Sequence, residues 1–292
     1  MHYTEPVFRP PQEAYTPLLE ITAGCTHSRC RFCNLNGQTK FRMAPLAQVE
    51  EDLRELSESI PHAKRIFFLM ANAFALSFDR LMERIDLVHK YLPEIKEISM
   101  QTRVQDIKNK TPEQLKVLHD QGIHFLYTGF ESGDDETLAF MDKNCTAKDI
   151  LEQTAKLDEA GIGYQVTFLN GVGGKKLSRQ HAINSGKVFS QLHPTDAVWI
   201  TSLVLLPDTK LYQDMQEGRF TPLTEKEMLE ESKLFLENLD MEARIKGSWL
   251  TTADIQGEFP KDRQRILGNI QYAIDHMDEK KTSEWRSGIR YI

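Results

Sequence analysis

Apolar segments alternate with amphipathic, capped segments along most of this chain. The apolar segments are near-continuous runs such as "RIFFLMA" and "AVWITSLVLL", which are typical of buried parallel strands. This alternation predicts an α/β fold in which helices cover a parallel sheet. We expect strands over 16–24, 65–71, 97–103, 125–132, 164–171 and 197–206, and helices over 45–59, 77–92, 111–122, 146–161, 178–192, 208–217 and 224–239.

Six strand–helix repeats in a chain of 292 residues fit a partial (β/α)6 TIM-like barrel. A doubly wound open sheet is the alternative architecture. The alternation stops after residue 239, where "GSWLTTADIQGEFP" precedes a single helical stretch. We therefore interpret 1–239 as the core and 240–292 as a short C-terminal extension packed on it.

Composition narrows the classes of function. The net charge is −7 and the sequence shows no strong basic patch, so nucleic acid is not an expected partner. No apolar run approaches the about 18 residues that span a bilayer, and the first residues lack the pattern of a signal peptide. We expect a cytoplasmic protein with no membrane contact, in which thiols stay reduced and clustered cysteines indicate metal binding or catalysis.

Three of the four cysteines lie within "AGCTHSRCRFCNL", directly after the first expected strand. Ligands of parallel α/β folds bind at the carboxyl ends of strands, so Cys25, Cys30 and Cys33 lie where chemistry is expected. With His27 they would make a Cys3His zinc site, although Cys25 and His27 are closer in sequence than the roughly two to four intervening residues usual for zinc ligands. Alternatively, three thiolates would hold a four-iron cluster and leave one iron open to a small molecule.

The stretch "EITAGCTHSRCRFCNL" resembles the opening of the radical S-adenosylmethionine (SAM) superfamily, with Phe32 at the family's aromatic position before the last cysteine. The usual spacing is C-x3-C-x2-C, and this chain has one extra residue in the first gap. "YTGFESGDDETLAF" and "LVLLPDTKLY" are similar to elements of the branch that contains coproporphyrinogen oxidases, methylthiotransferases and Elongator-type enzymes. The chain is identified as a member of this superfamily over roughly residues 16 to 239.

The resemblance implies an enzyme with a [4Fe–4S] cluster held by Cys25, Cys30 and Cys33, and with S-adenosyl-L-methionine bound at the open iron. One electron would cleave this cofactor to methionine and a 5′-deoxyadenosyl radical, which abstracts hydrogen from the substrate. The expected partners are a small-molecule or small-peptide substrate and a one-electron donor such as flavodoxin or ferredoxin.

The remaining candidate positions lie at or near the ends of expected strands, and the resemblance ties Asn72, Gly171 and Gly173 to cofactor-contacting motifs of the family. Asn72 lies where the family often has Gly-Gly-Glu, and Arg103 ends the third expected strand. Gly171 and Gly173 belong to "NGVGG", which resembles a glycine-rich turn of the family. A strand-end cap for Asn72 and a surface ion pair between Arg103 and Asp106 are the alternative interpretations. The predicted cofactor-binding residues are Phe32, Asn72, Arg103, Glu131, Ser132, Gly171 and Gly173.

Two further functions stay open from the sequence. One alternative is an iron–sulfur protein that transfers electrons or acts as a sensor. The other is a zinc-stabilised binding protein of barrel fold. The fourth cysteine, Cys145, is interpreted as an incidental thiol.

Overall fold

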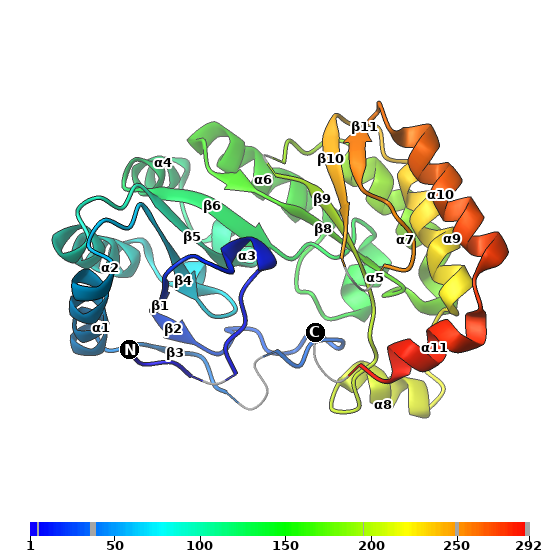
Figure 1. The fold of residues 1–292 in the computed structure, drawn as a ribbon, viewed down its shortest axis with the longest axis horizontal. Coiled ribbons are helices and arrows are strands. Elements are labelled where there is room, and N and C mark those ends of the chain that lie inside the picture. Colours follow the sequence, from blue (N-terminus) through cyan, green and yellow to red (C-terminus); the bar gives the residue numbers. More distant parts are fainter. Residues whose placement is uncertain (5, 36–38, 195, 249–250, 290–292) are drawn as a thin grey trace. The chain divides into compact units, whose positions relative to one another are not determined.

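The computed structural model describes residues 1–292 except 5, 36–38, 195, 249–250 and 290–292. These residues fold into two compact units (Figure 1). No helix in the described part of the chain has the length and apolar character needed to cross a membrane. The first unit holds residues 1–28, 35–129 and 152–164, and the second holds 29–34, 130–151 and 165–292.

The first unit is built on a five-stranded sheet in which every neighbouring pair is parallel. Its strands are β1 (Leu18–Glu20), β4 (Arg65–Leu69), β5 (Glu97–Thr102), β6 (Ile123–Thr128) and β7 (Gly163–Tyr164), which adjoin one another in that order. Four of the five residues of β4 are buried, as expected for a strand covered on both faces. This order follows the chain, as in successive strands of a (β/α) barrel.

Local capping signals set the helices of this unit. The Ser77 hydroxyl accepts the Arg80 N–H, and Thr111 and Gln114 form a reciprocal capping box. The elements are η1 (Pro11–Glu13), α1 (Leu46–Ser59), η2 (Ala73–Ala75), α2 (Phe78–Tyr91), α3 (Val104–Lys108), α4 (Pro112–Asp120) and the hairpin of β2 (Thr22–Ala23) with β3 (Arg42–Met43). Helix α1 packs against β1 and α2, and α4 packs against β6.

The N-terminal segment is joined to the sheet of the first unit through Glu13. The Glu13 carboxylate is buried and accepts hydrogen bonds from the hydroxyls of Tyr127 (2.6 Å) and Ser99 (2.8 Å). Arg65 adds an ion pair at 2.9 Å. Burial opposes ionisation of Glu13, but these partners outweigh it and lower the pKa of the carboxyl. An apolar cluster around Phe67 lies beside this contact and includes Val7 of the same segment.

The second unit has a four-stranded sheet with the order β11-β10-β9-β8. Its strands are β8 (Val166–Asn170), β9 (Val198–Ser202), β10 (Ala243–Gly247) and β11 (Gly257–Phe259). The first three are parallel, and β11 returns antiparallel to β10. The Phe168 ring stacks between His181 and Phe235, with ring centroids 4.6 and 4.0 Å away, and ties β8 to two helices.

Helices of the second unit pack on this sheet and on one another. The helices are α5 (Asp135–Phe140), α6 (Ala147–Ala160, which continues into the first unit), α7 (Gly174–Phe189), α8 (Lys210–Gln216), α9 (Glu225–Glu237), α10 (Arg263–His276) and α11 (Glu279–Ser287). Helix α9 contacts α7, α10 and α11, as Figure 1 shows. It is therefore the central helix of this layer.

The predicted α/β fold with parallel strands is confirmed, and several element boundaries need correction. The strand predicted over 164–171 splits into β7 of the first unit and β8 of the second, and the strand predicted over 125–132 is β6, which ends at Thr128. The strand predicted over 16–24 splits into β1 and β2, which pair with different partners. The strand predicted over 197–206 ends at Ser202. The helix predicted over 178–192 begins at Gly174 and ends at Phe189. Gly174 has φ +55°, and an added Cβ would lie 2.6 Å from the Phe220 ring, so this first position needs glycine.

The C-terminal extension contributes to the sheet of the second unit. Strand β10 pairs in parallel with β9 and continues the sheet by one strand. Its sequence, "ARIKG", is too short and polar to stand out as a buried strand. The division into a core over 1–239 and an extension over 240–292 stays a prediction.

Candidate functional site

The first cysteine of the loop follows β2 in the first unit. Gly24 has φ +71°, and a Cβ there would lie 2.5 Å from the Thr39 carbonyl oxygen. Only glycine fits this turn without displacing backbone. Cys25 then forms an isolated β-bridge with Lys40, and its carbonyl accepts a hydrogen bond from the Ser28 hydroxyl at 3.0 Å. The backbone around Cys25 is thus fixed on both sides.

Asn72 connects this loop to the end of β4. Its amide oxygen accepts the Thr26 N–H at 3.3 Å, and its amide nitrogen donates to the Thr26 hydroxyl at 2.6 Å and to Asp106 at 3.1 Å. The Asn72 side chain is fully buried. Burial raises the pKa of Asp106, while the hydrogen bond from Asn72 opposes the rise. The structure therefore uses the amide of Asn72 to hold the residue that follows Cys25.

Arg103 reaches the same residue from the end of β5. Its guanidinium lies 3.4 Å from the Thr26 hydroxyl, and its backbone N–H donates to Asp106 at 3.0 Å. Asp106 closes a capping box at the start of α3, so the contact with Arg103 runs through the backbone. Two of the predicted cofactor residues, Asn72 and Arg103, thus meet at Thr26.

The second and third cysteines belong to the second unit. The Cys33 N–H donates to the Cys30 carbonyl at 3.1 Å, which closes a turn between them. Arg31, inside this turn, exchanges backbone hydrogen bonds with Met141 and Leu211, and its guanidinium lies 2.5 Å from Asp214. All four cysteines of the chain are thiols of intermediate exposure.

A lysine that the sequence did not single out lies beside these two cysteines. The Lys143 ammonium is 3.6 Å from the Glu131 carboxylate and 5.6 Å from the centre of the Phe32 ring. Burial disfavours the ammonium, but Glu131 and the thiolates of Cys30, Cys145 and Cys33 outweigh burial and raise the pKa of Lys143. A retained positive charge here favours the thiolate form, which is the form that binds metals.

Glu131, three residues after the end of β6, has an unusual backbone conformation. It has φ +67°, a strained region for a residue with a side chain, and it bridges in parallel to Phe168. Backbone hydrogen bonds with Thr167 (3.0 Å) and Leu169 (2.9 Å) hold this geometry. The result is a partly exposed carboxylate next to Lys143.

Ser132 points into a buried network instead. Its hydroxyl lies 2.8 Å from Nδ1 of His181 and accepts the Asp134 N–H at 3.0 Å. Nε2 of His181 donates to the Leu169 carbonyl at 3.2 Å, so Nδ1 is the acceptor for Ser132. Burial lowers the pKa of His181 to about 4, which keeps the ring neutral at neutral pH.

Gly171 and Gly173 form the turn between β8 and α7. Gly171 has φ +86°, and its N–H donates to Glu231 at 2.5 Å. A Cβ on Gly173 would approach Leu177 at 3.2 Å and His181 at 3.3 Å. The positive φ of Gly171 favours glycine there, and the space around Gly173 is tight for any side chain.

The predicted residues thus fall into three groups. In the first unit, Asn72 and Arg103 gather at Thr26, next to Cys25. In the second unit, one group surrounds Lys143 and another surrounds His181. Among the described residues, no three His, Cys, Asp or Glu side chains converge as metal ligands, so the ligand role of the three cysteines rests on their spacing and chemistry. The group around Lys143 is Cys30, Phe32, Cys33 and Glu131, and the group around His181 is Ser132, Gly171 and Gly173.

Sequence reasoning missed Lys143 and Glu231, and it named Asp106 only as a surface partner of Arg103, whereas Asp106 is buried. Each is a charged residue in a stretch where charge is ordinary, as in "MDKNC" and "LEESK". Their burial and their partners, which come from distant segments, distinguish them. The sequence offered one weak signal for these residues, which is that Lys143 lies two residues before Cys145.

Comparison of the sequence with known proteins identifies the family of this chain. A sequence model described as the Radical SAM superfamily matches residues 19–185, more than half of the chain. The heme chaperone HemW of Bacillus subtilis is 24% identical over an alignment of 209 residues, and the alignment covers 67% of this chain and 52% of HemW. The chain thus spans about half the length of this curated relative.

Solved structures show the same fold. Methylornithine synthase (PylB) superposes with a TM-score of 0.52 at 15% identity, over 94% of this chain and 85% of PylB. Coproporphyrinogen III oxidase (HemN) from Escherichia coli, a radical SAM enzyme, superposes with a TM-score of 0.55 at 14% identity, over 76% of this chain and 52% of HemN. The matched segment begins in β1 and includes Cys25, Cys30 and Cys33. The chain belongs to the radical SAM superfamily, a family of enzymes that use a [4Fe–4S] cluster and S-adenosylmethionine.

Proposed function

We propose that Cys25, Cys30 and Cys33 hold the [4Fe–4S] cluster, and that the enzyme acts on a small molecule or a small peptide. The observation that carries this proposal is the position of the three cysteines, directly after β2 and inside the segment that matches the family. The donor set fits, because iron–sulfur clusters are bound by cysteine thiolates. Lys143, with its raised pKa, keeps a positive charge beside two of these thiols.

When bound, the cluster and S-adenosylmethionine would supply reductive cleavage of the sulfonium and, with it, hydrogen-atom abstraction from the substrate. The protein's own residues would position the bound groups. Glu131 presents a carboxylate suited to ribose hydroxyls or an ammonium group. Asn72 and Arg103 fix Thr26, and with it the loop at Cys25. We propose Phe32, Asn72, Arg103, Glu131, Ser132, Gly171 and Gly173 as the cofactor-binding residues; the hydroxyl of Ser132 would act through His181.

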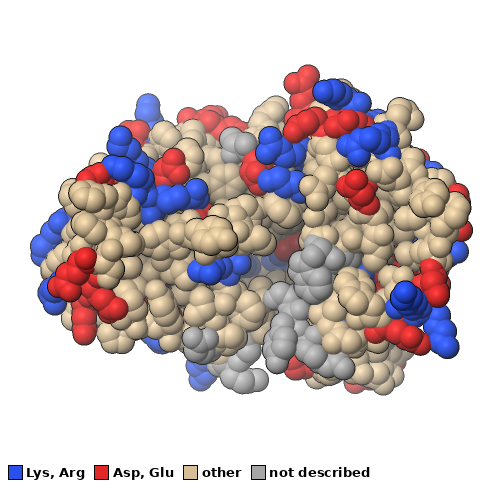
Figure 2. All heavy atoms as spheres, in the orientation of Figure 1, with Lys and Arg blue, Asp and Glu red and all other residues tan. Residues whose placement is uncertain are grey.

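The proposed partners are a one-electron donor, such as flavodoxin or ferredoxin, and the substrate. Nucleic acid is not proposed as a partner. Figure 2 shows positive and negative side chains intermixed on one face, as on an ordinary solvated surface, and the net charge is −7.

The test is anaerobic purification followed by reduction with dithionite in the presence of S-adenosylmethionine. We expect a brown protein with about four irons per chain that releases 5′-deoxyadenosine. Alanine at Cys25, Cys30 or Cys33 should each abolish this release, and Cys145→Ala is the matched control that should retain it. A colourless zinc protein would contradict the proposal. An iron protein that never cleaves the cofactor would indicate electron transfer or sensing, and loss of the cluster in Cys145→Ala would disprove the three-cysteine assignment.

A second candidate function is heme handling, and the similarity to the heme chaperone HemW favours it. It predicts saturable heme binding by the purified protein, visible as a Soret band that shifts on titration. The same titration in the presence of S-adenosylmethionine and dithionite separates the candidates, because a protein that only handles heme would bind heme without cleaving S-adenosylmethionine to 5′-deoxyadenosine.

A further inference from the structure

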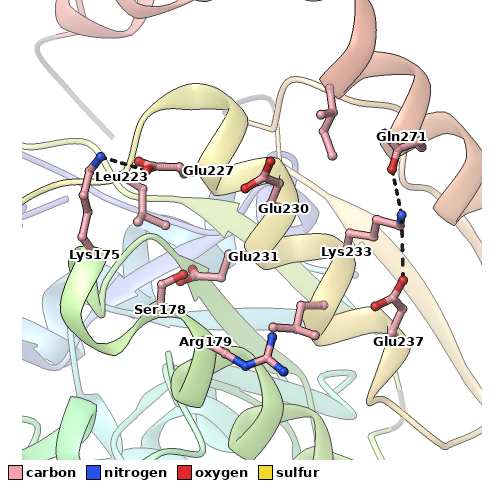
Figure 3. Close-up of a pocket in the computed structure, with 12 residues that line it drawn as sticks. Lys175, Ser178, Arg179, Leu223, Glu227, Glu230, Glu231, Lys233, Glu237 and Gln271 are labelled. Carbon is pink, nitrogen blue, oxygen red and sulfur yellow. Dashed lines mark hydrogen bonds and ion pairs between the residues drawn. The ribbon is translucent and has the colours of Figure 1, made fainter.

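A cavity of about 480 Å³ opens in the second unit, among helices α7, α9 and α10 (Figure 3). Apolar side chains such as Leu234 and Ile274 form part of its lining, and charged side chains form most of the rest. No residue of the predicted cofactor site lines this cavity. Its charges therefore require an explanation of their own.

Two of the three cations around the cavity already have partners. The Lys175 ammonium lies 2.8 Å from Glu227. The Lys233 ammonium donates to the Gln271 amide oxygen at 2.8 Å and lies 3.9 Å from Glu237. Figure 3 marks these contacts with dashed lines. They link α7 to α9 and α9 to α10, and they hold the cavity walls in place.

Three ionisable groups remain without a partner of opposite charge. Within the described part of the chain, no carboxylate pairs with the Arg179 guanidinium, and no cation pairs with Glu230. Glu231 differs from both because its side chain has no exposed surface. Its Oε1 accepts the Gly171 N–H, and the Ser178 hydroxyl also favours its ionised form, whereas its Oε2 is buried without a well-aligned hydrogen-bond partner among the described residues. Glu231 and Arg179 project from facing helices, α9 and α7 (Figure 3).

The unsatisfied oxygen of Glu231 is costly unless something occupies the cavity. Burial raises the pKa of Glu231 to about 8, so the carboxyl is mostly protonated at neutral pH. Nε2 of His181 lies 3.8 Å away, but it donates to Leu169 and its ring is neutral. No cation in the described structure therefore stabilises an ionised Glu231, although an ammonium group entering the cavity would.

We propose that this cavity binds a small zwitterion, whose ammonium group pairs with Glu231 and whose carboxylate pairs with Arg179. The unmatched groups are acids on α9 and a cation on α7. A simple cation would leave Arg179 without a partner, and a simple anion would leave Glu230 and Glu231 without one. Arg179 offers a planar pair of donors to a carboxylate, and the apolar wall suits a short aliphatic spacer.

The test titrates the cluster-loaded full chain with 6-aminohexanoate in a calorimeter. Hexylamine and hexanoate, which carry one of the two charges each, are the matched probes. We expect saturable single-site binding of 6-aminohexanoate, about tenfold tighter or more than either singly charged probe. No saturable binding of 6-aminohexanoate, or equal binding of hexylamine, would overturn the proposal.

Substitutions locate the site. Arg179→Ala and Glu231→Gln should each weaken binding about tenfold or more. Glutamine at position 231 keeps an oxygen that accepts the Gly171 N–H, but it cannot ionise. Lys176→Ala is the control, because it removes another cation from α7. The Lys176 side chain is 87% exposed and does not line the cavity. Unchanged affinity in Arg179→Ala, an exposed position whose loss does not threaten folding, would refute the proposal even if Glu231→Gln failed to fold.

Discussion

Lys143 brings a positive charge to two of the three cysteines that we propose as cluster ligands. Its ammonium is only 11% exposed, and Glu131 beside it is 17% exposed, so water screens their charges weakly. A lysine so placed stabilises thiolates, and thiolates are the nucleophilic and metal-binding form of cysteine. The charge of Lys143 therefore acts on the loop of Cys30 and Cys33, although Lys143 is far from this loop in the sequence.

Replacing this lysine should make the two thiols less reactive. We expect Lys143→Ala to slow alkylation of Cys30 and Cys33 by iodoacetamide in the cluster-free protein by roughly three- to tenfold at neutral pH, because the thiolate fraction falls. Peptide mass spectrometry after timed alkylation measures this. Lys148→Ala, at an exposed position nearby, is the control. Equal rates in both variants would show that Lys143 does not act on the thiols.

Glu231 makes stability depend on pH, and the sign can be derived. The pKa of Glu231 is about 8 in the folded chain and 4.5 in the unfolded chain. The folded state therefore binds more protons than the unfolded state between these two pH values. The contribution of Glu231 to stability is full below pH 4.5 and is lost as pH rises to about 8. The low pKa of His181 acts in the opposite direction, and its contribution is lost as pH falls from 6.5 to about 4.

Comparison with Glu231→Gln isolates this effect. The free energy of unfolding of the wild type, relative to the variant, should fall by roughly 3 kcal/mol between pH 5 and pH 8. The His181 contribution is common to both proteins and cancels in the difference. Urea unfolding at several pH values measures this difference. A difference that stays constant with pH would mean that Glu231 ionises normally and that the buried carboxyl has access to water.

At the scale of elements, Gly24 determines how β2 leads into the cluster loop. Gly24→Ala adds a Cβ 2.5 Å from the Thr39 carbonyl oxygen and imposes φ +71° on a residue with a side chain. We expect a loss of about 2 kcal/mol or more in the free energy of unfolding, together with less iron per chain, because Cys25 follows directly.

A glycine elsewhere provides the control for this substitution. Gly268 lies inside α10 with nothing within 4 Å of an added Cβ. Gly268→Ala should stabilise the protein by about 0.5–1 kcal/mol, because alanine loses less backbone entropy in a helix. Urea unfolding and iron analysis of both variants measure the contrast. If Gly24→Ala were as stable and as rich in iron as the wild type, the turn would tolerate a different backbone path.

Sequence reasoning located most elements because their signals are local. Ser77 and Thr111 cap the helices that they were predicted to start, and Pro112 occupies the first turn of α4. The misplaced boundaries depend on distant contacts, such as Phe220 against Gly174. The cysteines were found because their spacing is itself the signal. Lys143 and Glu231 were not, since their chemistry arises from burial and from partners far away in the sequence.

At the scale of the whole molecule, the region 240–292 is built into the sheet of the second unit. Strand β10 covers the edge of β9, and Ile245 at its centre is fully buried. Helix α10 packs on α9 through Ile266 and Ile270, which are also fully buried. Removing these residues would expose a strand edge and an apolar helix face, two features that promote aggregation.

Truncation after Leu239 should therefore give an insoluble or partly unfolded protein. In the full chain, Ile245→Ala should cost about 3 kcal/mol in the free energy of unfolding, because it leaves a cavity in the core. Arg244→Ala, on the exposed side of the same strand, should change it by only about 0.5 kcal/mol. Size-exclusion chromatography and urea unfolding distinguish the outcomes. A truncated chain that remained monomeric and cooperative would show that the first 239 residues form a complete core, and that β10 is dispensable despite its place in the sheet.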